Sequence, residues 1–323
     1  MKISFFETTN EEKEKLSKDF SMHECSFFDD RLNEESVHLA KDCEIVSVFV
    51  NSVVSKQVID SIPNLKFIST RSTGFDHIDT SYAKTKDIAT SNVPSYGSRT
   101  VAEFTFALLL EVSRKVAIGN AQLRDGLNYN LSNLRGFDLC GKTLGVVGTG
   151  KIGKNVIKIA KGFDMKVVAF DAFPDINFAK DNDFEYRSLD ELLSISDIVT
   201  LHTPYNKNTH YLINEDSIKL FKKGSYIINT ARGELINNKA LLLGIEKGII
   251  AGAGLDVLDG ERSLKENKDN SEILHEGRQL IKMPQVIVTP HVAFSSNEAE
   301  AEILRVTTNN ILSYINGTLS NTV

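Results

Sequence analysis

Residues 144–153, Leu-Gly-Val-Val-Gly-Thr-Gly-Lys-Ile-Gly, form a GxGxxG pattern that follows an apolar run and opens a helical one. In this setting Gly148 permits a tight turn, Gly150 lets the backbone approach a pyrophosphate, and Gly153 allows a helix to pack closely on a strand. The N–H groups at the start of the helix would bind the phosphates. Because glycines also close turns that bind nothing, the pattern alone is weak evidence for a dinucleotide site.

The next predicted strand ends at Phe170-Asp171, and Asp171 stands eighteen residues after Gly153. A carboxylate at this point can accept hydrogen bonds from ribose hydroxyls, and its charge would repel a 2′-phosphate. The alternative is that Asp171 only begins a turn. In the context of the glycine pattern we expect a dinucleotide site, with NAD favoured over NADP.

Further out along the chain, apolar runs rich in β-branched residues alternate with helical patterns, which is typical of a parallel α/β sheet. We expect strands at residues 143–147, 166–170, 198–202, 226–229, 250–255 and 286–288. The pattern repeats more weakly before Pro94, with strands expected at residues 2–6, 45–50 and 66–70. The predicted fold is therefore α/β with two doubly wound parallel-sheet domains, a Rossmann NAD-binding domain and a smaller flavodoxin-like substrate domain.

Two helical patterns connect these predicted domains. Apolar residues recur at helical spacing through residues 98–121, and a last helix at about residues 297–315 follows no strand of its own. One helix that leaves a domain and another that returns to it predict a discontinuous substrate domain, residues 1–97 and 296–323. The NAD-binding domain would be residues 98–295, and a cleft between the two domains is the expected active site.

Composition restricts the classes of function. The 323 residues carry a net charge of −6, whereas a nucleic-acid binder would need a basic stripe. No apolar run approaches the roughly eighteen residues of a membrane span. Three cysteines without a CxxC pair indicate reduced thiols in a cytoplasmic protein. We expect neither nucleic acid nor membrane as a partner, and no metal site.

Three further segments place reactive side chains just past predicted strands, where open α/β sheets bind their ligands. Arg232 could bind a carboxylate through two hydrogen bonds. Three carboxylates, Asp256, Asp259 and Glu261, follow the next predicted strand, and His291 follows the last one. Each has a plainer alternative: a surface ion pair for the arginine, a cap or loop for the acids, and a structural role for the histidine. The fallback histidines, also near strand ends, are His77 and His202.

Together these segments resemble the D-isomer-specific 2-hydroxyacid dehydrogenase family over nearly the whole chain. The matching pieces are residues 71–79 (RSTGFDHID), 92–96 (NVPSY), 144–153, 230–233 (TARG), 255–257 (LDV) and 289–291 (TPH). Within the family, Tyr96, the insertion at residues 262–284 and residues 291–294 are most similar to the D-lactate dehydrogenase branch. The chain departs from the family pattern at Leu258 and Asp259, where Phe and Glu are usual, and at Phe104, where His is common.

The resemblance implies a role for each of three residues. Arg232 would bind the carboxylate and the keto oxygen of the substrate. His291 would donate the proton in reduction and accept it in oxidation. Glu261 would hydrogen-bond His291 and stabilise its protonated form.

Substrate and cofactor contacts are also implied. The backbone N–H groups of Thr73 and Gly74, with Tyr96, would take the substrate carboxylate. Phe294 would face the side chain of the substrate, with residues 49–53 as the opposite wall. The implied cofactor-contacting residues are Gly148, Gly150, Lys151, Ile152, Gly153, Asp171, Thr203, Pro204, Thr209, Thr230, Ala231 and Asp256.

The predicted function is NAD-dependent reduction of a small 2-keto acid, with pyruvate favoured, to the D-2-hydroxy acid, and the reverse reaction. A homodimer through the interdomain helix region is expected. One alternative is another member of the family, of the hydroxyisocaproate, phenyllactate or phosphoglycerate type. Because the sequence ends at Val323, we do not expect the regulatory domain of many phosphoglycerate dehydrogenases, and Glu261 argues against formate dehydrogenase relatives, which carry Gln. A nucleotide-sensing binding protein on the same fold is the alternative from another class, and a turnover assay separates it.

Overall fold

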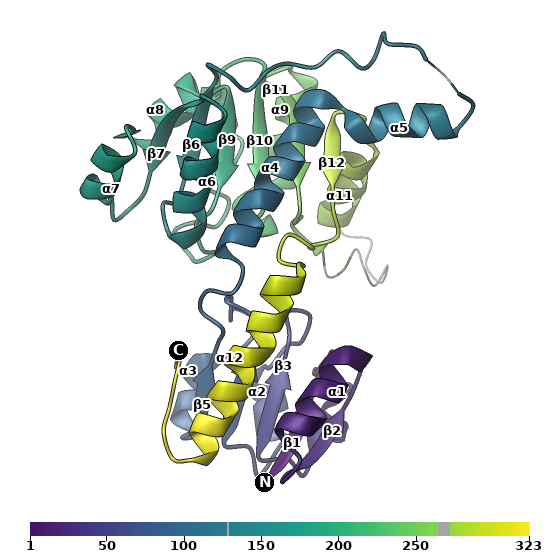
Figure 1. Ribbon diagram of the computed structural model, residues 1–323, viewed down its shortest axis with the longest axis vertical. Coiled ribbons are helices and arrows are strands. Elements are labelled where there is room, and N and C mark those ends of the chain that lie inside the picture. Colours follow the sequence, from purple (N-terminus) through teal and green to yellow (C-terminus); the bar gives the residue numbers. More distant parts are fainter. Residues whose placement is uncertain (128, 262, 264–271) are drawn as a thin grey trace. The chain divides into compact units, whose positions relative to one another are not determined.

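The computed structural model describes residues 1–127, 129–261, 263 and 272–323 (Figure 1). The described chain divides into two compact units. The first unit is Met1–Tyr96 with Ser296–Val323, and the second unit is Gly97–Ser295. None of the helices in these ranges is long and apolar enough to cross a membrane.

The first unit is built on a five-stranded parallel sheet in the order β2-β1-β3-β4-β5, which is the flavodoxin-type order. Its strands are β1 (Lys2–Phe5), β2 (Glu24–Phe27), β3 (Ile45–Val48), β4 (Phe67–Thr70) and β5 (Ala89–Ser91). Three of them, β1, β3 and β4, were predicted. The edge strand β2 was missed because it alternates exposed and half-buried residues instead of forming a buried apolar run, and β5 was missed because three residues are too few to carry a recognisable pattern.

Helices cover both faces of this sheet (Figure 1). They are α1 (Asn10–Asp19), α2 (Lys56–Asp60), α3 (Thr80–Thr85) and α12 (Asn297–Ile315), with a 3₁₀ turn η1 (Val37–Ala40). On one face, Leu16 of α1 and Ile311 of α12 pack against Phe67 in a common cluster. On the other, Val58 of α2 and Ala83 of α3 belong to a second buried cluster. The sheet is therefore apolar on both sides, as is typical of a parallel sheet covered by helices.

The second unit has a seven-stranded parallel sheet in the order β12-β11-β10-β9-β6-β7-β8, a Rossmann order extended by one strand. Its strands are β6 (Thr143–Val147), β7 (Lys166–Phe170), β8 (Glu185–Tyr186), β9 (Ile198–Leu201), β10 (Ser225–Asn229), β11 (Ile250–Leu255) and β12 (Val286–Val288). All were predicted to within one residue except β8, a two-residue edge strand. The predicted α/β class with two parallel sheets is confirmed.

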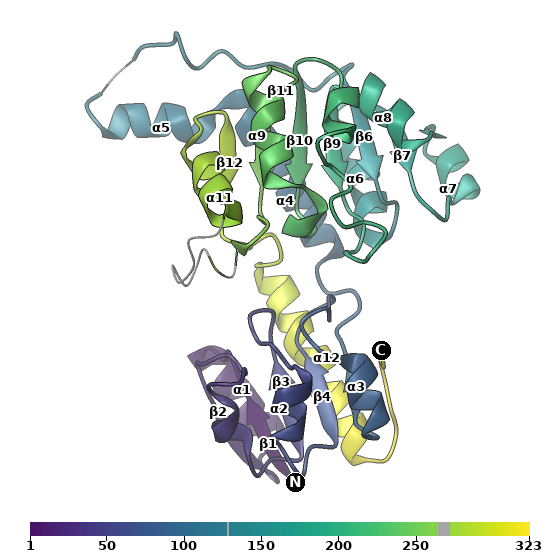
Figure 2. The same ribbon diagram turned by 180° about the vertical axis from the view of Figure 1, so that it is seen from behind.

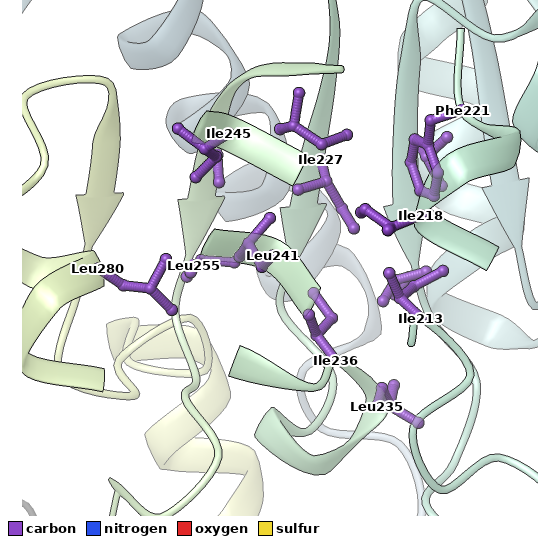
Figure 3. Close-up of a cluster of buried hydrophobic side chains, with 14 of the residues drawn as sticks. Ile213, Ile218, Phe221, Ile227, Leu235, Ile236, Leu241, Ile245, Leu255 and Leu280 are labelled. Carbon is purple, nitrogen blue, oxygen red and sulfur yellow. The ribbon is translucent and has the colours of Figure 1, made fainter. Parts of the chain in front are cut away.

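Two layers of helices enclose this sheet. On one face lie α4 (Ser98–Arg114) and α6 (Lys151–Gly162) (Figure 1), and their buried side chains share a cluster with those of β6. On the other face lie α8 (Leu189–Ile195), α9 (Asn238–Glu246) and α11 (Glu272–Lys282) (Figure 2). Figure 3 shows the cluster beneath them, in which Leu241 and Ile245 of α9 meet Ile227 of β10. The remaining elements are α5 (Val116–Arg124), α7 (Ile176–Asp181), η2 (Ser217–Leu220) and η3 (Gly233–Leu235).

One sequence prediction needs correction, and the insertion contains a further helix. The helix expected through residues 98–121 is two helices, because Lys115 adopts a left-handed conformation (φ 56°) that ends α4 and begins α5. The insertion at residues 262–284 contains α11, an amphipathic helix that buries Leu280. Residues 262 and 264–271 of that insertion lie outside the described residues.

Candidate active site

The glycine loop after β6 is shaped by close contacts that exclude side chains. Gly148 has φ 95°, and a Cβ there would lie 2.7 Å from the carbonyl carbon of His202. A Cβ on Gly153 would lie 2.0 Å from the carbonyl oxygen of Gly148. Gly150 differs, because nothing lies within 4 Å of the position its Cβ would take. Gly148 and Gly153 therefore serve the packing of β6, α6 and β9, whereas Gly150 leaves open space beside the start of α6.

Asp171 lies at the end of β7, beside this loop. Its Oδ2 accepts hydrogen bonds from the backbone N–H of Thr149 (2.6 Å) and from the Thr149 hydroxyl (3.0 Å). Its Oδ1 accepts from the N–H of Phe173 (2.8 Å). The carboxylate thus does begin a turn, which was the plainer alternative, and also ties that turn to the glycine loop. A carboxylate oxygen can accept more than one hydrogen bond, so these contacts leave capacity for a ribose hydroxyl.

The chemistry-bearing loops of the second unit lie at one edge of the sheet. The parallel register aligns Asn229, Leu255 and Val288, the last residues of β10, β11 and β12. Arg232 follows Asn229 by three residues, and the Asn229 amide shapes the turn between them. Its Nδ2 donates to the Arg232 carbonyl (2.8 Å), and its Oδ1 accepts from the N–H of Ala231 (3.0 Å). Sequence reasoning missed Asn229, although its place at the end of a buried strand was a usable signal.

The segment that carries His291 is held by one buried carboxylate. Asp256, which is 1% exposed, accepts from the Thr289 hydroxyl (2.6 Å) and from the N–H groups of Val292 (2.9 Å) and Ala293 (2.8 Å). The carbonyl of Asp256 accepts from the N–H of His291 (2.9 Å). Asp256 was predicted as a cofactor contact. That role stays a prediction, while the hydrogen bonds make the residue the anchor of this loop.

Glu261 meets the ring of His291. The Oε1 of Glu261 lies 2.7 Å from Nδ1 of His291, and the two side chains are 26% and 17% exposed. A carboxylate at Nδ1 favours the tautomer with its proton on that nitrogen and stabilises the imidazolium when Nε2 also takes a proton. The two residues are thirty positions apart in the sequence. The pair can therefore act as a proton donor or acceptor through Nε2.

The two fallback histidines are placed differently. Nε2 of His202 lies 2.7 Å from the Thr200 hydroxyl, and burial lowers the pKa of His202 to about 3. His202 is therefore neutral at any ordinary working pH and cannot be an imidazolium donor. His77 is buried in the first unit, with Nε2 3.1 Å from the hydroxyl of Thr70.

Thr73, Gly74 and Tyr96 belong to the first unit, where Thr73 and Gly74 follow β4. The hydroxyl of Thr73 donates to the carbonyl of Val93 (2.8 Å), and the Asn92 amide donates to the Thr73 carbonyl (2.7 Å). Among the described residues, neither the N–H of Thr73 nor that of Gly74 has a hydrogen-bond acceptor. Two adjacent N–H donors on a loop braced in this way suit a carboxylate ligand.

A second loop of the first unit is organised by Glu7, which sequence reasoning missed. Oε1 of Glu7 accepts from the N–H (3.0 Å) and side-chain amide (2.9 Å) of Asn51. Its Oε2 accepts from the N–H of Phe49 (3.1 Å) and from the N–H (3.0 Å) and hydroxyl (2.6 Å) of Ser52. Five hydrogen bonds on one carboxylate thus fix the segment predicted to form a wall of the substrate site.

The other predicted cofactor residues lie on loops that follow strands of the second unit or, for Lys151 and Ile152, at the start of α6. Thr203 and Pro204 come directly after β9, and the Thr209 hydroxyl donates to the Pro204 carbonyl (2.8 Å). The hydroxyl of Thr230 lies 2.9 Å from that of Thr105 on α4. Lys151 and Ile152 are the first residues of α6. These placements match where a dinucleotide binds on a Rossmann sheet, and the open space at Gly150 fits its pyrophosphate.

Known dehydrogenases and reductases are similar to this chain over most of its length. Residues 106–293 match the family model described as "D-isomer specific 2-hydroxyacid dehydrogenase, NAD binding domain". An aromatic 2-oxoacid reductase of Clostridium sporogenes is 36% identical over 93% of this chain and 91% of its own length. D-lactate dehydrogenase of Escherichia coli is 33% identical over 96% of each chain. The structure of D-lactate dehydrogenase from Aquifex aeolicus with NAD and lactic acid aligns with a TM-score of 0.90 and 32% identity. The alignment covers 98% of this chain and 96% of that one.

The glycine contacts generate a prediction about stability. Gly153→Ala should lower the free energy of unfolding by about 1–3 kcal/mol, because the new methyl group would collide with the Gly148 carbonyl. Gly162→Ala, in the last turn of the same helix, is the matched control, since nothing lies within 4 Å of its Cβ position. That change should leave stability unchanged or raise it by up to about 1 kcal/mol. Urea unfolding measures both, and equal stabilities for the two variants would contradict the packing role of Gly153.

Proposed function

Because the chain belongs to the D-isomer specific 2-hydroxyacid dehydrogenase family and is an NAD-dependent 2-hydroxyacid dehydrogenase, we propose that it interconverts a small 2-keto acid and the D-2-hydroxy acid, with pyruvate and D-lactate favoured. The observation that carries this proposal is the 2.7 Å contact between Glu261 and His291. It lies at the sheet edge that also carries Arg232. A proton donor and a cation at one edge are what carbonyl reduction requires.

In the proposed reduction, each catalytic residue of the second unit would have one role. Bound NADH supplies the hydride for the keto carbon. Arg232 binds the substrate carboxylate through its planar guanidinium and stabilises the negative charge that develops on the keto oxygen. His291 donates a proton from Nε2 to that oxygen, and Glu261 keeps Nδ1 protonated throughout.

The preferred side chain of the substrate is a separate proposal. The relatives differ in this respect, since one is named for aromatic 2-oxoacids and another for D-lactate. Phe294 follows His291 by three residues and is half-buried, so it is suited to form an apolar wall. The loop fixed by Glu7 is proposed as a second determinant of side-chain size, because the small and exposed Val53 leaves room there. We therefore expect pyruvate as a good substrate, with tolerance for larger keto acids.

We also propose a homodimer through the helix region at the start of the second unit, which includes α4, α5 and the segment after them. Helix α5 contains no buried residue, which is unusual for a helix of nine residues. Large apolar side chains are exposed on it and on the segment that follows, including Leu127, Tyr129 and Leu131. Several large exposed apolar side chains on one segment of the chain are typical of a protein interface.

Replacing the proton donor should separate turnover from cofactor binding. His291→Gln should lower turnover of pyruvate with NADH by roughly 10²–10⁴-fold, because general acid transfer is lost. NADH affinity, measured by fluorescence titration, should stay within about twofold of wild type. His275→Gln, on an exposed position of α11, is the control and should keep full activity. Near-normal turnover in His291→Gln, or L-lactate as the main product of the wild type, would refute the assignment.

Removing the apolar wall should change substrate preference. In Phe294→Ala the ratio of phenylpyruvate to pyruvate efficiency should rise several-fold, since apolar pocket changes of this size are worth about 1–3 kcal/mol. The measurement is kcat/KM for both keto acids, with a thermal melt to establish that the variant is folded. An unchanged ratio in a folded variant would assign size selection to the Glu7-bound loop instead.

If the proposed dimer forms, carboxylates introduced at its interface should weaken it. The wild type should have twice the mass of one chain in light scattering, and the double variant Leu127→Glu, Leu131→Glu should shift toward the monomer. A buried unpaired carboxylate is costly at an apolar interface. Leu319→Glu, at another exposed leucine near the end of the first unit's chain, should leave the mass unchanged. A monomeric wild type would overturn the proposal.

A further inference from the structure

Tyr211 occupies an unfavourable backbone conformation in the second unit, beside the loops that follow the carboxyl ends of its strands and carry the candidate active site. It lies in the loop after β9 and has φ 48°, in the left-handed region that residues with a Cβ seldom adopt. Such outliers persist only where the surrounding contacts hold them, and they concentrate at functional sites. The contacts of Tyr211 therefore indicate what the conformation is for.

Those contacts join three loops. The N–H of Tyr211 donates to the carbonyl of Glu234 (2.9 Å), just after Arg232 on the loop that follows β10. Its phenolic hydroxyl donates to Oδ2 of Asp259 (2.6 Å), on the loop that follows β11. One residue from the β9 loop thus braces both the segment of Arg232 and the segment of Glu261.

Asp259 in turn is held tightly and lies close to Glu261. It is 8% exposed, and its backbone carbonyl accepts from the side-chain amide of Asn238 (3.2 Å). Between the two acids stands Gly260, in a left-handed conformation (φ 76°), and the N–H of Glu261 donates to the Leu258 carbonyl (3.1 Å). This tight turn leaves little freedom between Asp259 and Glu261. A displacement of Asp259 would therefore move Glu261.

We propose that Tyr211 is a positioning residue for catalysis: its hydroxyl, by holding Asp259, sets the place of Glu261 against Nδ1 of His291. This role rests on the proposed function of the Glu261–His291 pair. It also accounts for the departure at position 259, where Asp replaces the usual Glu, because the long tyrosine side chain reaches the shorter carboxylate. Burial, followed by the hydrogen bond and charge of Asp259, raises the pKa of Tyr211, so the hydroxyl remains a donor at working pH.

The variant Tyr211→Phe tests this, because it removes one hydroxyl and keeps the ring. Its kcat for keto-acid reduction should fall by about tenfold or more, since small displacements of catalytic groups have effects of that size. NADH affinity should stay within about twofold. Tyr205→Phe, on the same loop and with an exposed ring, is the matched control and should behave as wild type. A kcat within twofold of wild type, or a loss of NADH affinity parallel to the loss of kcat, would overturn the proposal.

Two further measurements make the test specific. In a Glu261→Gln background, Tyr211→Phe should add little further loss, because both changes act through the same residue; full additivity would overturn the proposal. Hydrogen exchange of the peptide that contains residues 256–261 should be faster in Tyr211→Phe than in wild type or Tyr205→Phe, and unchanged exchange would likewise overturn it. The exchange measurement does not depend on turnover. If the wild type reduced no 2-keto acid, the proposed function would fail, while the exchange result would still decide whether Tyr211 holds this turn.

Discussion

The loops that carry the candidate active site, at the carboxyl ends of the strands of the second unit, depend on the buried carboxylate of Asp256. An ionised group that is 1% exposed must be satisfied by hydrogen bonds, and three donors from residues 289–293 satisfy it. Hydrogen bonds to a charged acceptor contribute roughly 1.5–3 kcal/mol each, whereas a left-handed residue with a Cβ costs about 1–2 kcal/mol. The hydrogen bonds therefore prevail, and His291 is kept at φ 58°. Its ring reaches Glu261 because its backbone is held in this way.

This anchor works only because the sheet has already brought the loops together. The parallel register sets the ends of β10, β11 and β12 side by side, so residues far apart in sequence leave the sheet at one edge. Backbone and side-chain contacts between neighbouring loops then fix the loops to one another. Gly233 comes so close to the backbone after β11 that a Cβ on it would lie 2.1 Å from the carbonyl carbon of Leu258. Asn229 shapes the Arg232 turn, and Tyr211 spans from a third loop to Asp259.

The sheet register and the contacts between loops differ in how far the sequence could predict them. Long buried strands such as β6 and β11 carry a continuous apolar pattern, so they and the sheet class were predictable. The two-residue β8 and the helix break at Lys115 depend on neighbours that no local pattern reveals. In the site, the positions of reactive residues just past strands were predictable. Contacts such as that of Tyr211 with Asp259, forty-eight residues apart, were not, because nothing near either residue marks the other.

In the first unit, too, one carboxylate holds a loop in place, but with different residues. Glu7 has φ 55°, its carbonyl accepts from the buried guanidinium of Arg71 (2.7 Å), and its carboxylate collects five hydrogen bonds from residues 49–52. As with Asp256, one charged acceptor holds a loop whose backbone would otherwise be free to move. A loop fixed before the ligand arrives loses less conformational entropy on binding. It also presents its dipoles in place as charge develops in the reaction. Each unit therefore uses one hydrogen-bonded carboxylate, the buried Asp256 or the half-buried Glu7, to order a loop in a way that benefits binding and catalysis.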